Sequence, residues 1–595
     1  MIEKMKKITL LVSVKERDPF LSALRKAGVV HVGQVSEPSV GDLPLIEKQI
    51  TKVGTAITAL SLYKESKAAE QVKPGEQELL ERAGKISESF HDKERFEQEI
   101  MDLKHKLAWY DRWGEFEPEE IMALKKKGVN VVLYRLSRKQ FDDVKDKGLL
   151  KEIYSEKRDV YAVGINLDAE EKLEYEEILL PLKGPGELKK ESSYREQKLK
   201  DMDLFLKENI GAAEAFKELK DSLKKKREFL TVKFGMREEG IFTCLQGFCP
   251  AKYVPRVLGM AKDHGFGYLV EDPDDPEETP TLITNPRWID IIRPVFSFMN
   301  TIPGYEEFDI SFVFMVFFSL FFAMLIGDAG YGIIFAVITY LVRRKARKLP
   351  PQPFFLMYLL SGATIVWGAI TGTWFGAERI AQLPLLNSLV INKISSFAGD
   401  NQNFMMFICF VIGAVHLTIA HLTRGIRLIN SPVSLAQFGW ISIIWGMFFT
   451  AGTLVIGRPF PHFAFYFLGA GILLVLVFAN FQKNMFKGML MTLAQLPLNV
   501  IGAFSDVVSY IRLFAVGYAT VIVAQSFNDM AIGEGINSVL GGLVAALILF
   551  FGHTLNIMLG LMAVVVHGIR LNMLEFSSNH LGMQWTGRKY KPFSE

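Results

Sequence analysis

The first half of the chain carries a helical pattern of hydrophobic and polar positions. Apolar residues recur there at alternating steps of four and three, which is the spacing of a heptad seam between packed helices. The stretches with this stepping are 46–60, 79–90, 96–107 and 212–223. Charged helices are predicted over 168–182 and 187–232. The pattern predicts coiled-coil helices, with ordinary packing of separate helices as the alternative.

Short β-branched runs interrupt these helices at three places. Residues 6–35 and 240–273 each have the pattern of a strand, a helix and a strand. Between them, strands are predicted at 128–136 and 158–165, on either side of a short helix. The order predicts a dumbbell in which α/β lobes lie at the two ends of a long antiparallel coiled-coil hairpin.

The second half consists mainly of apolar stretches long enough to cross a bilayer. Eight membrane spans are predicted: 308–326, 331–343, 354–375, 403–423, 436–456, 460–481, 499–528 and 537–577. The first two form one apolar tract broken by Gly327-Asp328-Ala329-Gly330. A single helix through this tract would be about 53 Å long, too long for one span. We therefore expect a tight hairpin there, with a single kinked helix as the alternative.

Charge separates the two halves more sharply than the overall net charge of +3 indicates. Residues 1–300 hold 105 charged residues and a net charge of −3, whereas residues 301–595 hold 28 and a net charge of +6. This predicts a cytosolic domain over 1–300 and a membrane domain over 301–595. The acidic, proline-rich stretch 272–286 is the predicted linker. The N-terminus has no signal-peptide pattern, and three cysteines form no disulfide framework.

Basic residues predict the orientation of the spans. Loops after the even-numbered spans hold twelve Lys and Arg residues, and the opposite loops hold three. The twelve are Arg343, Arg344, Lys345, Arg347, Lys348, Arg424, Arg427, Lys483, Lys487, Arg588, Lys589 and Lys591. Because basic loops stay in the cytosol, both termini are expected there, in a multi-pass protein of the cell membrane.

Arg512 is the most unusual residue of the membrane half. It lies about 13 residues into its predicted span, or roughly 20 Å along a helix. A charge at that depth costs about 2.5–3.5 kcal/mol on insertion scales, so intramembrane arginines usually have a function. Small residues share its predicted helical face, and small residues allow a second helix to approach. The alternative is a structural arginine paired with an acid of its own bundle.

Further polar residues lie on both sides of Arg512 along the predicted helices. Arg570 and His567 share a predicted face of the last span with Asn556, Ala563 and Leu574. Candidates for a cytosolic ion half-path are Asp506, Ser505, Ser509 and His567. Candidates for an outer half-path are Gln525, Asn528, Asp529, His553 and Asn556. This layout indicates two aqueous paths separated by a positive charge, although each polar residue could instead be interfacial.

Several kinds of site are missing from the sequence. Gly84-Lys85 lacks the remaining residues of a phosphate loop, and the glycines of 327–332 are better explained by helix packing. No Cys/His metal set and no nucleophile–base pair stands out. We therefore expect no catalytic centre, no bound metal, no cofactor and no nucleic-acid partner.

Four motifs and the C-terminus resemble one known family. These are SDVVSYIRLFAVG around Arg512, VHGIRLNMLEF around Arg570, PGYEEFDIS at 303–311, GDAGYG at 327–332 and the terminal YKPF at 590–593. In order and spacing they are similar to subunit a of V-type and A-type ATPases, called subunit I in prokaryotes. The resemblance covers the whole chain, including GFCP at 247–250, where members usually have a Gly-Trp-Val-Pro-like motif.

The resemblance implies a stator subunit of a rotary membrane motor, in a prokaryote. Arg512 would face the carboxylate of the rotating proteolipid c/K ring, and Arg570 would be the family's second arginine. The cytosolic arm would join the peripheral-stalk E and G subunits and contact the central-stalk d/C subunit. Asp506 stands where eukaryotic members often have a histidine. Thr520 and Gly560 stand where they tend to have a histidine and an acid.

Two other function classes stay open from the sequence. An autonomous secondary ion transporter would use broken helices near the bilayer midplane, usually within internal repeats, but no matching halves are visible. A membrane tether would use its arginines only structurally. The sequence leaves open whether the ion is H⁺ or Na⁺, and whether the motor pumps ions or makes ATP.

Overall fold

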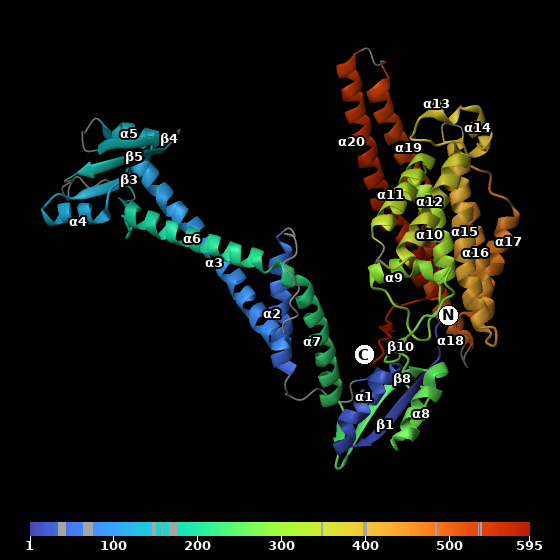
Figure 1. Cartoon of the computed structure of the whole chain (residues 1–595). Helices are drawn as coiled ribbons and strands as arrows, with labels where there is room; N and C mark the ends of the chain where they lie inside the picture. The colour runs from blue at the N-terminus through green and yellow to red at the C-terminus, as the bar shows by residue number, and fades with distance from the viewer. Residues whose placement is uncertain are drawn as a thin grey trace. The chain divides into compact units, whose positions relative to one another are not determined.

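The computed structural model describes most of the chain, in two compact units (Figure 1). The described residues are 1–33, 43–63, 75–145, 150–156, 159–165, 175, 177–346, 349–396, 401–481, 485–533, 535 and 538–594. The first unit comprises 1–11, 24–33 and 246–594, and the second comprises 12–23 and 34–245. Most of the predicted helix 168–182 lies outside the described residues, as do Arg347, Lys348 and Lys483.

Long helices form the arm of the second unit. These are α2 (Leu43–Ser61), α3 (Glu76–Trp113), α6 (Pro185–Glu208) and α7 (Ala213–Phe234). Ion pairs Lys93–Asp203 (2.7 Å) and Lys104–Glu196 (3.2 Å) connect α3 and α6. The α6 partner moves back along the sequence as the α3 partner moves forward, so the two helices are antiparallel, as predicted.

The arm has a buried core drawn from the predicted heptad positions. Val53, Ala83, Ile86, Phe216 and Leu223 are among its buried members. One prediction is wrong here, because the continuous helix expected over 187–232 is interrupted. A short 3-10 turn, Ile210–Ala212, separates α6 from α7.

A four-stranded sheet belongs to the same unit. Its order is β4 (Leu150–Glu156), β5 (Asp159–Ile165), β3 (Val131–Ser137) and β6 (Glu177–Ile178). The helices α4 (Pro118–Lys126) and α5 (Arg138–Lys145) complete this lobe. Strands β3 and β5 were predicted, whereas β4 was not. The strand at Glu177–Ile178 contradicts the helix predicted there.

The strand–helix–strand patterns predicted at 6–35 and 240–273 are confirmed. The first folds as β1 (Met5–Ser13), α1 (Arg17–Ala27) and β2 (His31–Val32). The second folds as β8 (Phe242–Pro250), α8 (Val254–Asp263) and β9 (Gly267–Glu271). Their strands form one sheet of order β2-β8-β1-β9, and the short β7 (Arg237–Glu239) pairs with β8.

The C-terminal tail is fixed within the first unit. Strand β11 (Arg588–Lys589) pairs in parallel with β10 (Pro280–Thr281). The Tyr590 hydroxyl donates to the Val29 carbonyl at 2.7 Å, and the Phe593 backbone N–H donates to the Val30 carbonyl at 2.8 Å. The YKPF motif therefore connects the end of the chain to its first α/β pattern.

All eight apolar segments predicted in the second half fold as helices. They are α10 (Ser311–Ile326), α11 (Ala329–Lys345), α12 (Gln352–Thr371), α15 (Gln402–Arg427), α16 (Val433–Ile456), α17 (Phe463–Phe478), α18 (Met485–Ser509) with α19 (Ile511–Ile532), and α20 (Val539–Ala563) with its continuation to Leu581. Among the described residues, five helices are long and apolar enough to span a membrane, or six if the bent pair α10–α11 counts as one. The seventh helical segment begins at Met485, the first residue of α18, and not near residue 499 as predicted.

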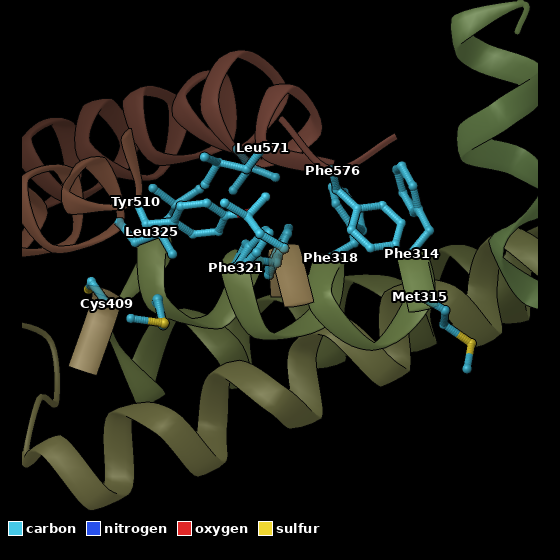
Figure 2. Close-up of a cluster of buried hydrophobic side chains, with 14 of the residues drawn as sticks. Phe314, Met315, Phe318, Phe321, Leu325, Cys409, Tyr510, Leu571 and Phe576 are labelled. Carbon is cyan, nitrogen blue, oxygen red and sulfur yellow. The ribbon is translucent and has the colours of Figure 1, made fainter. Parts of the chain in front are cut away.

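Helix α10 supplies many of the buried side chains of the membrane core, several of which are labelled in Figure 2. Phe314, Phe318 and Phe321 of α10 are buried against helices from the other end of the membrane half. Tyr510 and Phe576 belong to the same cluster. The core thus joins the first and last membrane helices around the segment that contains Arg512.

The break predicted between the first two apolar segments is confirmed. The chain turns by 118° between α10 and α11. Gly327 has φ +68°, a conformation that glycine adopts without strain. Asp328 then caps α11 by accepting from the Gly330 N–H at 2.8 Å, and its other oxygen accepts from the Gly376 N–H at 2.9 Å. The GDAGYG motif therefore has a structural role at this bend.

We expect Gly368→Ala to destabilise the membrane half, because α12 touches this bend. A Cβ on Gly368 would lie 2.1 Å from the Ala329 backbone nitrogen, whereas one on Gly362 of the same helix meets nothing within 4 Å. Overpacking costs about 1–3 kcal/mol. Thermal unfolding in detergent should show a lower midpoint for Gly368→Ala and no decrease for Gly362→Ala. Equal midpoints would contradict the close packing at this bend.

Candidate functional site

The segment with Arg512 has one buried side and one open side. Tyr510, Leu513, Gly517, Val521 and Ala524 are buried in the helix bundle. The side predicted to contain small residues is exposed or half-buried in the described structure. Its members are Ser505, Ser509, Arg512, Val516, Ala519, Val523 and Ser526. The predicted small-residue face is therefore only partly covered within the described chain, where Val516 packs against the membrane core.

The last membrane helix changes its winding before it reaches Arg570. α20 ends at Ala563, and π-helical turns follow at Val564–Gly568 and Leu571–Leu581. Such turns bond residue i to i+5 and occur frequently at functional sites. They bring residues five apart, here Arg570 and Glu575, toward one side.

The changed winding overturns one sequence prediction. The common face predicted for Asn556, Ala563, His567, Arg570 and Leu574 assumed regular α-helix. That assumption fails beyond Ala563.

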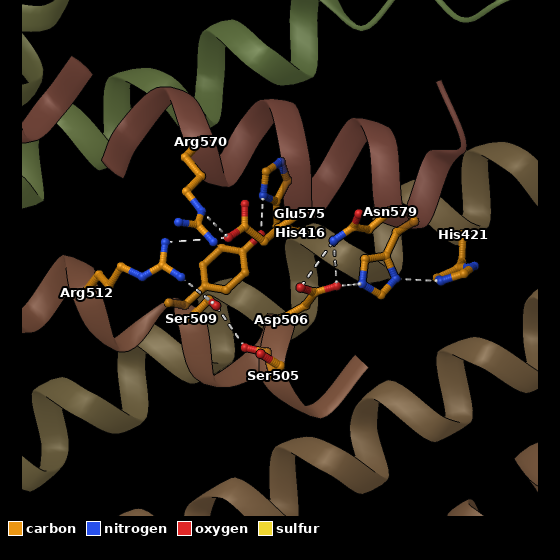
Figure 3. A network of polar contacts seen from close by, with 11 residues as sticks. His416, His421, Ser505, Asp506, Ser509, Arg512, Arg570, Glu575 and Asn579 are labelled. Atoms are coloured by element: carbon orange, nitrogen blue, oxygen red, sulfur yellow. Dashed lines mark hydrogen bonds and ion pairs between the residues drawn. The ribbon is translucent and has the colours of Figure 1, made fainter. Parts of the chain in front are cut away.

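Arg512 and Arg570 both face Glu575 (Figure 3). The nearest nitrogen–oxygen distances to Glu575 Oε1 are 3.6 Å from Arg512 Nη1 and 3.3 Å from Arg570 Nε. The Glu575 side chain is 3% exposed, compared with 26% for Arg512 and 52% for Arg570. A buried carboxylate thus lies between two arginines that reach the open surface.

Arg512 keeps part of its hydrogen-bonding capacity. Its Nη2 donates to the Ser509 hydroxyl at 2.9 Å. The 3.6 Å contact with Glu575 is too long for a hydrogen bond. Since a guanidinium has five N–H donors, Arg512 can still bind a carboxylate supplied from outside the chain.

A second polar group lies on the predicted cytosolic side of Arg512. Asp506 Oδ2 is 3.1 Å from His580 Nε2, and Asn579 donates to Asp506 at 3.1 and 3.3 Å. His580 Nδ1 is 2.9 Å from His421 Nε2. His421 Nδ1 is in turn 2.8 Å from Gln437 Oε1. These side chains come from α18, α15, α16 and the second π-helical segment.

On the predicted outer side, three of the five candidates meet. The Tyr331 hydroxyl is 2.7 Å from His553 Nδ1 and accepts from the Asn556 amide at 3.0 Å. His553 Nε2 is 3.1 Å from Asn528 Oδ1. The structure does not bring Gln525 and Asp529 into this hydrogen-bonded group. Gln525 is half-buried and Asp529 is exposed.

Some important residues were missed at the sequence level. Glu575 belongs to the motif VHGIRLNMLEF and is the only acidic residue between residues 538 and 581. A single acid in an apolar stretch could have identified it as a site residue. No comparable sequence feature marked His421, His580 or Asn579 as site residues. Of the predicted cytosolic candidates, Ser505 and Ser509 lie on the open side, and His567 lies in the first π-helical turn beside Arg570. No cluster that could hold a metal ion occurs among the described residues.

Comparisons with known proteins find relatives along the whole chain. No protein-family model matches it. The chain is 33% identical to a V-type ATP synthase subunit I from Borreliella burgdorferi and 29% identical to one from Treponema pallidum, each over the full length of both chains. An A-type ATP synthase subunit I from Methanocaldococcus jannaschii is 26% identical, over 62% of this chain and 57% of that protein.

Solved structures also align with part of the chain. One of them is the cytoplasmic N-terminal domain of a subunit I, homolog of subunit a, of V-ATPase. The alignment has 15% identity and a TM-score of 0.25, and it covers 44% of this chain and 99% of that chain.

Proposed function

The chain belongs to the subunit I family of V/A-type ATP synthases, a non-catalytic membrane subunit, and from that premise we propose how it works. Its membrane half forms two ion half-channels against the proteolipid ring. Arg512 faces the ring carboxylate between them. Its soluble arm anchors the peripheral stalks. The observation that carries the proposal is the open, small-residue side of α18–α19, with Arg512 upon it.

The charge arrangement supports this role for Arg512. An arginine is always charged, so it stabilises an ionised ring carboxylate and favours release of the bound cation. The same charge repels free cations, which keeps the two half-channels separate. Glu575 fixes the position of the guanidinium from the buried side, and the exposed part of Arg512 is left for the ring.

The candidate half-channel residues fall on opposite sides of Arg512 along the helix axis. The distribution of basic residues favours the cytosolic side for Asp506 and its histidine partners. The group of Tyr331, Asn528, His553 and Asn556 would then lie toward the outer side, and its hydrogen bonds support a common path. Eight membrane crossings, cytosolic termini and a dumbbell-shaped arm complete the proposed architecture.

A tether with structural arginines is the competing function, because the ion pair with Glu575 suits it. Reconstitution into vesicles separates the possibilities. A stator moves ions only when the ring and the catalytic head are present. The chain purified alone should move none. Ion movement by the isolated chain would indicate a transporter, and complexes that pump normally without this chain would indicate a tether.

We also expect the arm to bind stalk helices and not nucleotide. Leu179 and Leu182 are 88% and 95% exposed beside a groove of about 820 Å³ that also includes Trp109. Burial of one leucine contributes about 1.5–3 kcal/mol, so Leu182→Glu in a 1–290 fragment should weaken binding of the peripheral-stalk E–G pair by about tenfold or more. Calorimetric titration measures this.

The matched control for the arm is Leu62→Glu, a leucine that is also exposed but lies away from the groove. It should bind the E–G pair with the affinity of the unmodified fragment. Micromolar binding of ATP to the fragment, or equal losses in both variants, would contradict this assignment.

A further inference from the structure

Four polar side chains form a continuous hydrogen-bonded row beside Asp506. The row runs from Gln437 through His421 and His580 to Asp506, with successive distances of 2.8, 2.9 and 3.1 Å. Gln437, His421 and His580 are buried, and the Asp506 side chain is 16% exposed. Only the Asp506 end is therefore open to protons from outside the bundle.

The row determines where its protons lie. Gln437 Oε1 accepts from Nδ1–H of His421, so Nε2 of a neutral His421 has a free electron pair. This nitrogen accepts from Nδ1–H of His580. Nε2 of His580 then has a free pair that faces a carboxylate oxygen of Asp506 at 3.1 Å. Two acceptors at that distance require a proton between them, so this arrangement holds one added proton.

Rotation of one amide gives a second arrangement. If the Gln437 NH₂ group donates to His421 Nδ1, then His421 Nε2–H donates to His580 Nδ1. His580 Nε2–H then donates to an ionised Asp506. Every contact of the row is satisfied, and the row contains one proton fewer. Gain or loss of a single proton therefore requires only tautomer exchange and an amide rotation.

The charged side chains next to the row do not cancel the charge that it gains with an added proton. Asn579 donates to both Asp506 oxygens. Arg424 of α15 lies one turn from His421, near Gly582. Glu575 is already shared by Arg512 and Arg570.

We propose that Asp506, His580 and His421 form a proton-loading site, and that the transported ion is H⁺. This rests on the proposed stator function. The site takes a proton at Asp506 from the cytosolic side and supplies it to the ring path beside Arg512. Hard metal cations prefer several oxygen ligands. Here the partners of the carboxylate are an imidazole and an amide NH₂ group, so Na⁺ is a poor fit.

The test uses the complete complex in vesicles, with a pH-sensitive dye inside. Wild-type complex should move protons in Na⁺-free buffer. His421→Gln and His580→Gln should make the rate per assembled complex follow the bulk proton concentration, a loss of about tenfold for each pH unit on the alkaline side, because the proton-holding group is gone. Rates are normalised to assembled complex.

The control is His416→Gln on the same helix as His421. His416 is buried between the rings of Phe317 and Phe576 and bonds to the Tyr510 hydroxyl, outside the row. It should alter assembly but not the pH dependence per complex. Should the row variants fail to assemble, infrared titration of wild-type complex should show a carboxyl band and a histidine band that change together and are lost in Asp506→Asn.

Three results would overturn the proposal: transport that requires Na⁺, a wild-type pH dependence in both row variants, or no linked infrared change. The stator function has a separate test in Arg512→Ala. If Arg512→Ala abolishes transport and the row variants behave like wild type, only the proton-loading site fails.

Discussion

Arg512→Ala should abolish ion transport per assembled complex. The ring carboxylate would lose the positive charge that favours release of its cation, so the ring would stall or turn without moving ions. Arg512→Lys should also be severely impaired, because an ammonium is a point charge without the planar donor fork of arginine. Ion flux in vesicles, divided by the amount of assembled complex, is the measurement.

Assembly should survive Arg512→Ala, since Glu575 does not lose its last partner. In the unmodified chain Arg570 Nε lies 3.3 Å from Glu575 Oε1, so Arg570 can still pair with this carboxylate when Arg512 is replaced. The double variant Arg512→Ala/Arg570→Ala leaves this 3% exposed carboxylate unpaired and should assemble poorly. Arg570→Ala alone should be milder for transport. If Arg512→Ala lowers assembly but transports normally per complex, Arg512 is structural and the stator mechanism is wrong.

Glu575→Ala should lower the rate of ion transport by about 10²-fold. Without Glu575 the Arg512 guanidinium would be misplaced, and a small misplacement of a functional group can lower a rate by that factor. The variant removes the carboxylate that faces both Arg512 and Arg570. Assembly should be largely retained, since both arginines reach the surface and can be rehydrated. Vesicle flux per complex measures the effect, with ATP hydrolysis recorded in parallel.

The control for this prediction is Glu378→Gln, which changes an exposed acid away from the arginines. It should transport like wild type. Glu575→Asp should recover part of the lost flux if the carboxylate acts by holding Arg512. Normal flux in Glu575→Ala would remove Glu575 from the mechanism.

Local sequence rules succeed where short-range interactions decide the structure. The heptad positions of α2, α3 and α7 are buried in the arm as expected, because packing of an apolar stripe drives these helices together. The break at Gly327 and Asp328 is also readable locally. The missed strand at Leu150–Glu156 is different, since four of its seven residues are neither apolar nor β-branched, and pairing with β5 stabilises it.

The candidate site also combines features that follow from the sequence with features that depend on tertiary packing. The sequence alone determined that an arginine lies deep in an apolar span with a face of small residues, because both follow from the order of residues along one helix. Only the tertiary structure placed Glu575 against it. In a regular α-helix Glu575 would point roughly 140° away from Arg570, and the π-helical winding reduces that separation. The row of Gln437, His421, His580 and Asp506 likewise joins residues far apart in the chain, so helix packing decided it.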